Sequence, residues 1–398
     1  MSRRYIGSLI DAFNALKVAN APTIGTAFAG NTLVCVNFTA PNCVGGGAIT
    51  GYTAVSSPGS ITGTGTTSPV SVTGLTNCTA YTFTVRACNA FGPSAFSAAS
   101  SSATPVVSGT LAIFALGVVS NVNSTTRNKY TYSGCVSASA TAATNASSNG
   151  SAAGNSTVGI FALGITTSNS AIRNKYTYSG CTNASATAAS NNSSQGSAAG
   201  NSTVGIFALG NVTCATSTIR DKYTYSGCVN ASAAAACVAS LFSSAVGNAT
   251  RGIFALGLIG CNCSNARLKY TYSGCTNASA TSASYISSGG AAAGNATVGI
   301  FALGHAGGCG YRSAVRDKYT YSNCTNASAT SASNNSFRGS AAGNSTTGIF
   351  ALGCVTNNPS TTRNKYTYSG DVNASATAAS AASTSSAAAS NGTTGVNV

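Results

Sequence analysis

The sequence is poor in charge and holds few of the side chains that carry out enzymatic chemistry. Charged residues make up 6% of its 398 residues, against about 25% in an ordinary globular protein. Glutamate is absent, and the side chains that carry a carboxylate or an imidazole are Asp11, Asp221, Asp317, Asp371 and His305. General acid–base catalysis and hard-cation binding both need such groups gathered at one point. We therefore expect a protein that is not an enzyme and that uses no metal or cofactor.

Tryptophan is absent, and so is any long apolar run. A membrane helix needs about 18 consecutive apolar residues, so we expect no membrane insertion. The fifteen cysteines include no C-x-x-C pair, and the closest two are Cys261 and Cys263. Secreted disulfide frameworks usually occupy short chains with an even number of cysteines. We expect reduced cysteines that pack as small apolar side chains.

Positive charge is in excess, with a formal net charge of +15. Such a balance generally favours nucleic acid or an anionic surface as a partner. Twelve of the nineteen basic residues, however, belong to one recurring R-x-K pattern: Arg127/Lys129, Arg173/Lys175, Arg220/Lys222, Arg267/Lys269, Arg316/Lys318 and Arg363/Lys365. Because these pairs are spread evenly, without any nucleic-acid motif, we expect no nucleic-acid partner. We interpret them as hydrogen-bonding groups within and between repeat units, with anionic glycans or phosphates as the alternative ligands.

Residues 1–20 form a segment of their own. Apolar residues recur in it at three- and four-residue spacing, which predicts one apolar face of a short helix: Ile6, Leu9, Ile10, Phe13 and Leu16. A helix this short is marginal in water unless it packs on something. We therefore expect an attachment segment that docks on a partner, with disorder as the alternative. Its basic start also resembles a secretion signal, but Asp11 and Lys17 interrupt the apolar stretch, which such signals avoid.

Residues 21–105 alternate short β-rich runs with turns of Gly, Pro, Ser and Asn, which is typical of a β-sandwich. The runs include VNFTAP, AITGYTAVSSPG and GLTNCTAYTFTVRACNAFGPSAFSA. On these runs the segment resembles a fibronectin type III domain. Leu75 and Tyr81 fit the tyrosine corner of that family, in which the phenol bonds back to the backbone. The resemblance implies a spacer or adhesion module, with Val34 and Val36 filling the space of the missing core tryptophan.

Residues 106–398 are an array of six repeats marked by two motifs. The first is IFALG, with phenylalanines 46 to 49 residues apart at Phe114, Phe161, Phe207, Phe254, Phe301 and Phe350. The second is KYTYS, with tyrosine pairs at Tyr130/Tyr132, Tyr176/Tyr178, Tyr223/Tyr225, Tyr270/Tyr272, Tyr319/Tyr321 and Tyr366/Tyr368. An apolar run between glycines is typical of a strand buried on both faces. Alternation in KYTYS places both tyrosines of a pair on one face.

Three or four short strands in about 47 residues is the size of a propeller blade. The units resemble diverged kelch-like repeats with G-I-F-A-L-G and R-x-K-Y-T-Y, although the kelch Gly-Gly doublet and tryptophan are missing. We therefore expect an all-β chain, a fibronectin type III-like sandwich followed by a six-bladed kelch-like β-propeller. Residues Asn391–Val398 are expected to supply a closing strand beside Leu111–Gly117. An open β-solenoid stack is the alternative.

The segments between IFALG and the next R-x-K differ in every repeat. Variation on a constant scaffold is how binding surfaces are built, although neutral drift in exposed loops would give the same pattern. The segment His305–Val315 is the longest, and it carries the only histidine together with Tyr311 and Arg312. Tyr and Arg are enriched at binding hot spots. We predict that His305, Tyr311 and Arg312 contact a partner.

The repeats and the opening MSRRYIG resemble structural proteins of marine tailed phages. That resemblance implies a virion protein, a tail fibre, spike or appendage that is assembled in the host cytoplasm as part of an oligomer. Residues 1–20 would contact other virion proteins, and the propeller loops would contact a glycan or protein of the host surface. A bacterial secreted or surface adhesion protein, extracellular or at the cell surface, is one alternative, and a polyanion-binding protein is another.

Overall fold

The computed structural model describes residues 17–30, 32–76, 79–105, 111–132, 136–307 and 310–391. The chain divides into two compact units, Met1–Val107 and Ser108–Val398. All regular elements in the described ranges are β-strands, which confirms the all-β class. No helix suited to crossing a membrane occurs in these ranges. The helix expected from Ile6, Leu9, Ile10, Phe13 and Leu16 lies outside the described residues.

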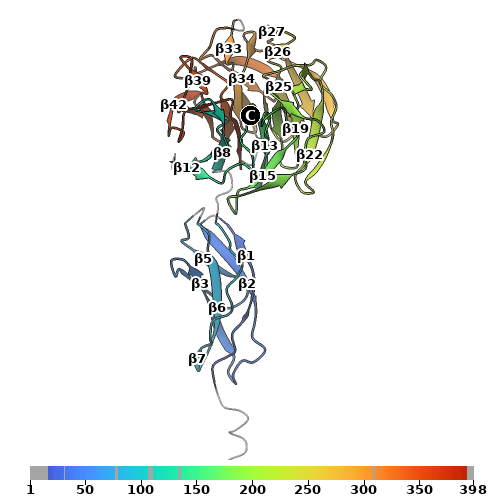
Figure 1. The fold of residues 1–398 in the computed structure, drawn as a ribbon. Coiled ribbons are helices and arrows are strands. Elements are labelled where there is room, and N and C mark those ends of the chain that lie inside the picture. The colour runs from blue at the N-terminus through green and yellow to red at the C-terminus, as the bar shows by residue number, and fades with distance from the viewer. Residues whose placement is uncertain are drawn as a thin grey trace, which may run out of the picture. The chain divides into compact units, whose positions relative to one another are not determined.

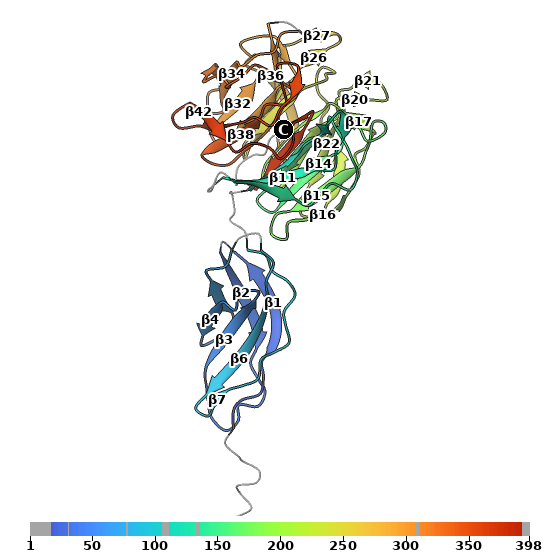
Figure 2. The same ribbon diagram turned by 60° about the vertical axis from the view of Figure 1, so that its left-hand side comes forward.

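The first unit consists of two antiparallel sheets (Figure 2). One sheet has the strand order β1 (Thr23–Ala29), β2 (Leu33–Thr39), β5 (Val70–Thr73). The other has the order β4 (Thr62–Gly65), β3 (Ile49–Ser57), β6 (Thr82–Asn89), β7 (Gly92–Pro93). Every second residue of β2 and β6 is buried, because successive side chains of a strand point to opposite faces. The buried faces of both sheets share one core.

That core contains the residues that the sequence indicates. Val34, Val36, Phe83 and Val85 are fully buried. The hydroxyl oxygen of Tyr81 accepts a hydrogen bond from the Thr76 amide at 3.1 Å, the backward bond that a tyrosine corner makes. The first unit also begins before residue 21, where the sequence predicts its start. The Lys17 amide donates to the Gly45 carbonyl at 2.9 Å, the Asn20 amide donates to the Cys43 carbonyl at 3.0 Å, and Ala19 is buried. Residues 17–20 therefore belong to the first unit and not to an independent segment.

The second unit contains six four-stranded antiparallel sheets with one repeated strand order. The first strand of each sheet comes from the Ser-Ala-Ala-Gly segment or its variants: β44 (Ala387–Ser390), β13 (Ser151–Gly154), β18 (Ser197–Gly200), β24 (Ser244–Gly247), β31 (Ala291–Gly294) and β37 (Ser340–Gly343). The second carries the IFALG motif: β8 (Leu111–Ala115), β14 (Val158–Ala162), β19 (Val204–Ala208), β25 (Arg251–Ala255), β32 (Val298–Ala302) and β38 (Thr347–Ala351).

The third strand of each sheet begins at the repeated arginine: β11 (Arg127–Thr131), β15 (Arg173–Thr177), β22 (Arg220–Thr224), β28 (Arg267–Thr271), β34 (Arg316–Thr320) and β41 (Arg363–Thr367). The fourth is the Asn-Ala-Ser-Ala run: β12 (Val136–Ala140), β16 (Thr182–Ala186), β23 (Val229–Ser232), β29 (Thr276–Ala280), β35 (Thr325–Ala329) and β42 (Val372–Ala376). Exposure rises toward the fourth strand, in which three of the five residues are exposed in β16, β29, β35 and β42.

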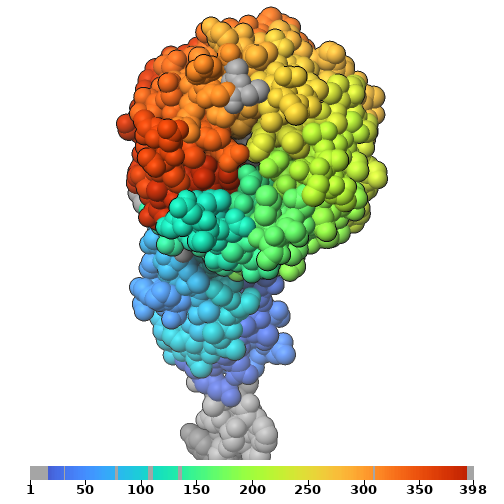
Figure 3. Space-filling model, turned by 45° about the horizontal axis from the view of Figure 1, so that its top comes forward, coloured from blue at the N-terminus to red at the C-terminus, as the bar shows by residue number. Residues whose placement is uncertain are grey.

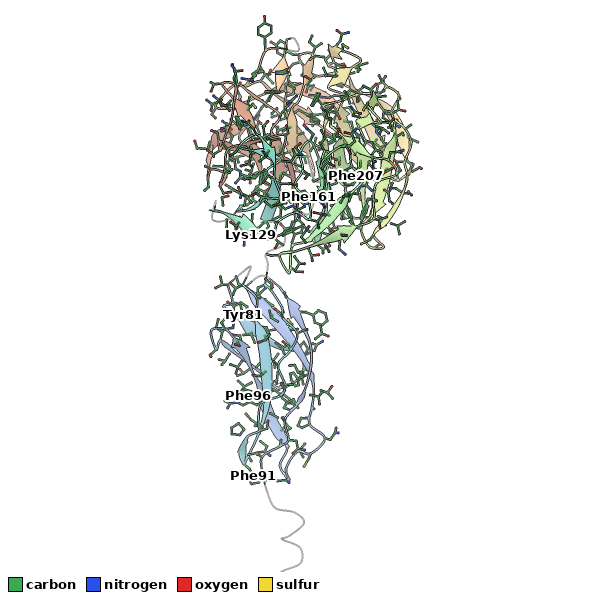
Figure 4. The ribbon with its side chains drawn as sticks, viewed as in Figure 1. Tyr81, Phe91, Phe96, Lys129, Phe161 and Phe207 are labelled. Atoms are coloured by element: carbon green, nitrogen blue, oxygen red, sulfur yellow. The ribbon has the colours of Figure 1, made fainter. Side chains whose placement is uncertain are left out.

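Burial of the two sequence motifs follows their patterning. Phe161 and Phe207 lie inside the second unit (Figure 4), where they are 1% and 0% exposed. All twelve tyrosines of the KYTYS pairs are buried as well, and the two rings of each pair lie 5.7 to 6.2 Å apart between centroids. The first strands carry small side chains and are buried along their whole length. Small side chains are needed there because neighbouring sheets approach closely.

The first strands contact one another in a cycle. Figure 1 shows β8 and β12 of the first sheet on the same side of the second unit as β42 from its last repeat. Each of β13, β18, β24, β31 and β37 contacts the next, β37 contacts β44, and β44 contacts β13. In Figure 3 the colours follow sequence order around this unit, and red lies beside teal. The last strand, β44, pairs with β8, so that Ala387 lies opposite Ala115 and Ser390 lies opposite Ala112.

The closing segment is therefore earlier than the sequence predicts. The expected segment was Asn391–Val398, whereas β44 ends at Ser390 and only Asn391 of that segment is described. Asn391 extends the pairing: its amide donates to the Leu111 carbonyl at 2.9 Å, and its side-chain oxygen accepts from the Leu111 amide at 2.7 Å. The small residues before Asn391 fit the crowded position better than the Gly-Thr-Thr-Gly run beyond it, because they match the Ser-Ala-Ala-Gly segments of the other sheets.

Candidate functional site

The six repeated arginines are buried between neighbouring sheets and are 0 to 1% exposed. Each guanidinium lies over a phenylalanine of the next sheet, with 4.4 to 4.6 Å between the guanidinium carbon and the ring centroid. The pairs are Arg127/Phe161, Arg173/Phe207, Arg220/Phe254, Arg267/Phe301, Arg316/Phe350 and Arg363/Phe114. The last pair joins the sixth sheet to the first. Such contacts are most favourable where water is excluded.

Each guanidinium also donates to side chains of the next sheet. Arg173 donates to Asp221 at 2.9 Å and to Asn230 at 2.8 Å, whereas Arg127 donates to Asn174 at 3.2 Å and to Asn183 at 2.6 Å. Burial lowers to about 10 the pKa of the four arginines that lack a carboxylate partner, Arg127, Arg220, Arg316 and Arg363. The hydrogen bonding between units predicted for the R-x-K arginines is observed, and these six side chains are not open to a ligand.

Asp371 joins two sheets at the exposed end of the interface. Its carboxylate forms an ion pair with Lys318 of the preceding sheet and accepts from the Tyr366 hydroxyl at 2.7 Å. Partial burial alone would raise the pKa of Asp371, but the hydrogen bonds from Lys318 and Tyr366 outweigh it and lower that pKa. Arg363 and Lys365 are the basic residues of its own repeat, but the Asp371 side chain reaches Lys318 of the preceding sheet instead.

The cysteines differ in state within the described ranges. Cys228 lies 3.7 Å from the Lys175 ammonium at the place that Asp371 takes in the sixth sheet, and it is a free thiol. Cys263 is disulfide-bonded. The expectation of reduced cysteines therefore does not apply to Cys263. No group of three or more His, Cys, Asp or Glu gathers in the part of the chain that the structure describes.

The variable segments form short hairpins at one edge of the sheets. Examples are β9 (Val118–Val119) with β10 (Val122–Asn123), and β20 (Asn211–Val212) with β21 (Ala215–Thr216). They pair with the linkers that lead into the first strands, as β20 does with β17 (Ser193–Ser194) and β33 (His305–Ala306) does with β30 (Ser287–Ser288). Since every hairpin follows the same strand of its sheet, the hairpins share one face of the unit, which we call the hairpin face.

Six linker residues form a closed ring of backbone hydrogen bonds at the hairpin face. Each has a positive φ between 48° and 62°, and each amide donates to the carbonyl of the preceding member at 2.8 to 3.0 Å. The members of this linker ring are Asn149, Gln195, Phe242, Gly289, Arg338 and Ser385. Ser385 accepts from Asn149, which closes the cycle. Non-glycine residues rarely adopt this conformation, so the ring fixes five side chains around one centre.

Two members of the linker ring belong to an aromatic and basic cluster. A cavity of about 180 Å³ is lined by Phe242, Leu258, Ser288, Gly289, His305, Phe337 and Arg338. The His305 and Phe337 rings are stacked, with 4.4 Å between centroids and 18° between planes. Arg338 lies over both Phe242 and Phe337 at 5.1 Å, and Arg312 lies over Phe337 at 4.9 Å. We call Phe242, Leu258, His305, Arg312, Phe337 and Arg338 the Phe337 cluster.

The charges of this cluster have no partner within the described residues. Arg312 and Arg338 make no side-chain hydrogen bond or ion pair there, and the buried Nε of Arg312 is unsatisfied. The described carboxylates are engaged elsewhere: Asp221 and Asp317 pair with buried arginines, and Asp371 pairs with Lys318. Burial, together with the positive charges of Arg312 and Arg338, lowers the pKa of His305. The arrangement offers donors and positive charge beside apolar walls.

Two of the three predicted partner-binding residues thus come together. His305 and Arg312 face each other in a β-bridge, and both belong to the Phe337 cluster. Tyr311 does not join them in the cavity; it is 75% exposed and lines a separate groove with Arg312, Asn334 and Thr356. Residues 308 and 309 of the same segment lie outside the described residues.

The residues that sequence reasoning missed are Phe242, Leu258, Phe337 and Arg338. The linkers read SSNGS and SSQGS in two repeats but SLFSS and SFRGS where Phe242, Phe337 and Arg338 occur. Departure from the repeat consensus was the available signal. A residue that departs from the consensus in a single repeat cannot have a structural role common to all six repeats, so it is a candidate for a local function.

Comparisons with known proteins add little. No family model matches the chain, and no curated protein matches it. Among solved structures, domains A168–A170 of titin match with 26% sequence identity over 22% of this chain, with a TM-score of 0.21. The match spans 32% of the titin fragment.

Proposed function

We propose that the second unit is a closed six-bladed kelch-like β-propeller and that the first is a fibronectin type III-like sandwich. The cycle of first-strand contacts, the pairing of β44 with β8 and the closed linker ring support the propeller over the open stack. The orders β1-β2-β5 and β4-β3-β6-β7, together with the Tyr81 hydrogen bond, support the sandwich. Closure covers the edge of β8 with β44, so that the first sheet is completed by the end of the array, and a covered edge is protected against edge-to-edge association.

We propose that this protein is a non-enzymatic binding protein that recognises a partner through the hairpin face. The supporting observation is the Phe337 cluster, where Arg312 and Arg338 lie unpaired beside aromatic rings while the repeated arginines are all engaged. Unpaired guanidinium groups next to aromatic rings are frequent at binding hot spots. The partner in this proposal is a glycan or protein of a host surface.

The setting we propose is a virion, where the chain is a fibre, spike or appendage held by its first residues. This part rests on the resemblance of the repeats and of MSRRYIG to phage structural proteins. A chain lacking residues 1–16 keeps the residues that pack on the first unit, so it should fold normally and fail to join the particle. Antibody labelling of purified particles measures incorporation, and a truncated chain that is incorporated normally contradicts the attachment role.

Binding through the hairpin face has its own test. Fluorescently labelled full-length chain is measured on bacterial cells of a host panel, as wild type and as Arg312→Gln. Loss of one hot-spot contact should weaken binding about tenfold. Val122→Ala, on a different hairpin and 64% exposed, is the matched control and should bind normally. Equal binding by all three proteins would exclude the Phe337 cluster as the recognition surface.

A further inference from the structure

We propose that the Phe337 cluster binds the carboxylate-bearing ring of an acidic sugar. This inference rests on the proposed function, because it names the ligand class of the same face. The cavity of about 180 Å³ is smaller than the roughly 300–1,000 Å³ of sites for drug-sized molecules. Its volume therefore suits a ligand of one ring, such as a single terminal monosaccharide.

The walls of the cavity favour a ligand with one flat apolar face. Phe242, Leu258 and Phe337 line it, and the ring of Phe337 is already stacked on His305. Apolar side chains of this kind can make van der Waals contacts with the C–H groups on one face of a pyranose. The hydroxyls at the rim of such a sugar would remain in contact with water.

The donors at the cavity favour a carboxylate. A guanidinium matches the two oxygens of a carboxylate with two parallel hydrogen bonds, and the exposed Arg338 side chain lies over the cavity-lining rings of Phe242 and Phe337. A phosphate presents three strong acceptor oxygens. Beyond the guanidinium group of Arg338 and the imidazole of His305, the cavity lining supplies one side-chain hydroxyl, from Ser288. The cavity therefore complements a planar carboxylate group attached to a partly apolar ring better than it complements a phosphate.

Neighbouring positions around the linker ring show that the site is local. The same ring positions hold Asn149, Gln195 and Ser385 elsewhere, which provide neither charge nor an apolar wall. The positive and aromatic side chains come from consecutive repeats. Phe242 lies in the linker between the third and fourth sheets, and Leu258 follows the second strand of the fourth sheet. His305 follows the second strand of the fifth sheet, and Arg338 lies in the linker that leads into the sixth. One acidic sugar per chain follows from this asymmetry.

The experiment measures binding of sodium glucuronate, glucose and inorganic phosphate to the full chain by titration calorimetry or ligand-detected NMR. Glucuronate should bind with a Kd of about 1 mM, as expected for a ligand of its size. Arg338→Gln should weaken that binding at least tenfold, and it should fold normally because Gln195 occupies the same ring position with the same positive φ. Lys222→Gln removes an equal charge on another strand and should bind like wild type.

Three results would overturn the inference: glucose binding as tightly as glucuronate, phosphate binding as tightly as glucuronate, or Lys222→Gln weakening binding as much as Arg338→Gln. The outcome also separates this inference from the proposed function. If glucuronate does not bind while cells bind the wild type more tightly than Arg312→Gln, the acidic-sugar site is wrong while recognition by the hairpin face stands. If glucuronate binds but no cell surface does, the site stands and the host-recognition function is wrong.

Discussion

Two nearly identical sheet interfaces allow the cost of a stranded buried charge to be measured. Arg173 and Arg127 each lie over a phenylalanine, at 4.6 and 4.5 Å, and each donates to two side chains of the next sheet. The difference is the partner, which is the carboxylate of Asp221 for Arg173 and the amide of Asn174 for Arg127. The perturbation is therefore Arg173→Ala compared with Arg127→Ala.

The expected magnitudes differ because only one change leaves a charge behind. Arg127→Ala loses the ring contact and two hydrogen bonds but also ends the burial of a cation beside neutral groups, so it should destabilise by about 2 kcal/mol. Arg173→Ala strands Asp221, which keeps hydrogen bonds from Ser190 and Asn230. Breaking a buried pair in this way costs about 3–5 kcal/mol. We expect a difference of about 2 kcal/mol between the variants.

Urea unfolding followed by near-ultraviolet circular dichroism measures both values. Twelve of the 17 tyrosines belong to the KYTYS pairs, so this signal reports mainly the second unit. Asp221→Asn in the Arg173→Ala background should recover most of the difference, because it removes the charge and preserves a hydrogen-bonding side chain. If Arg173→Ala costs no more than Arg127→Ala, or if Asp221→Asn recovers nothing, the stranded-charge reasoning is refuted.

Two further predictions concern backbone strain and alkaline pH. Gly210→Ala should destabilise by about 3 kcal/mol, because φ is +69° and a Cβ would lie 2.6 Å from backbone atoms of Ser194 and Gln195. Gly260→Ala is the control: its φ is +62° but the space around it is open, so it should cost about 1 kcal/mol. Equal urea midpoints for the two variants would contradict the argument from close backbone approach. Burial raises the pKa of ten paired tyrosines and lowers that of six arginines. Above pH 10 the unfolded chain loses tyrosine protons that the folded chain keeps, which lowers stability as pH rises, while the arginines act in the opposite sense. Because the tyrosines are more numerous, the urea midpoint should fall above pH 10, and a constant or rising midpoint would show that the phenols titrate normally.

Repetition made the buried core of the second unit predictable. Phe207 and its counterparts stand in an apolar run between glycines, and alternation placed Tyr223 and Tyr225 on one face. These features depend on local periodicity, which a single repeat displays and six repeats confirm. The same reasoning found Val34, Val36 and Tyr81 in the first unit, where alternation along each strand separates the core face from the exposed face.

Contacts between repeats were beyond the reach of periodicity. The partner of Asp371 is Lys318 because side chains at that place reach the preceding sheet, and no pattern within one repeat reveals the direction. The Asn-Ala-Ser-Ala run and the Ser-Ala-Ala-Gly segment are both rich in small side chains. The first forms the exposed fourth strand, whereas Ala198 and Ala199 of the second lie in the crowded first strand. Small residues satisfy either position, so only the three-dimensional arrangement distinguishes them.

The sequence predicted only part of the candidate site, because its residues come from different repeats. His305 and Arg312 drew notice as rare residues in a variable segment, whereas Phe242 and Arg338 stand in linkers 96 positions apart along the numbering. They meet because the linker ring brings successive linkers together and holds each in the same conformation. Residue rarity can be read from a sequence, but proximity around a ring follows from closure.

Closure of the second unit also orders the events of protein synthesis. Leu111 and Asn391 are hydrogen-bonded although 280 residues separate them. On a ribosome, β8 emerges before the other five sheets and its partner β44 emerges after them, so one edge of the first sheet lacks its neighbour while the other sheets are made. During that interval the waiting strand can pair with a strand of another nascent chain. Translation speed and chaperone access between the synthesis of β8 and that of β44 should therefore influence the yield of correctly assembled protein.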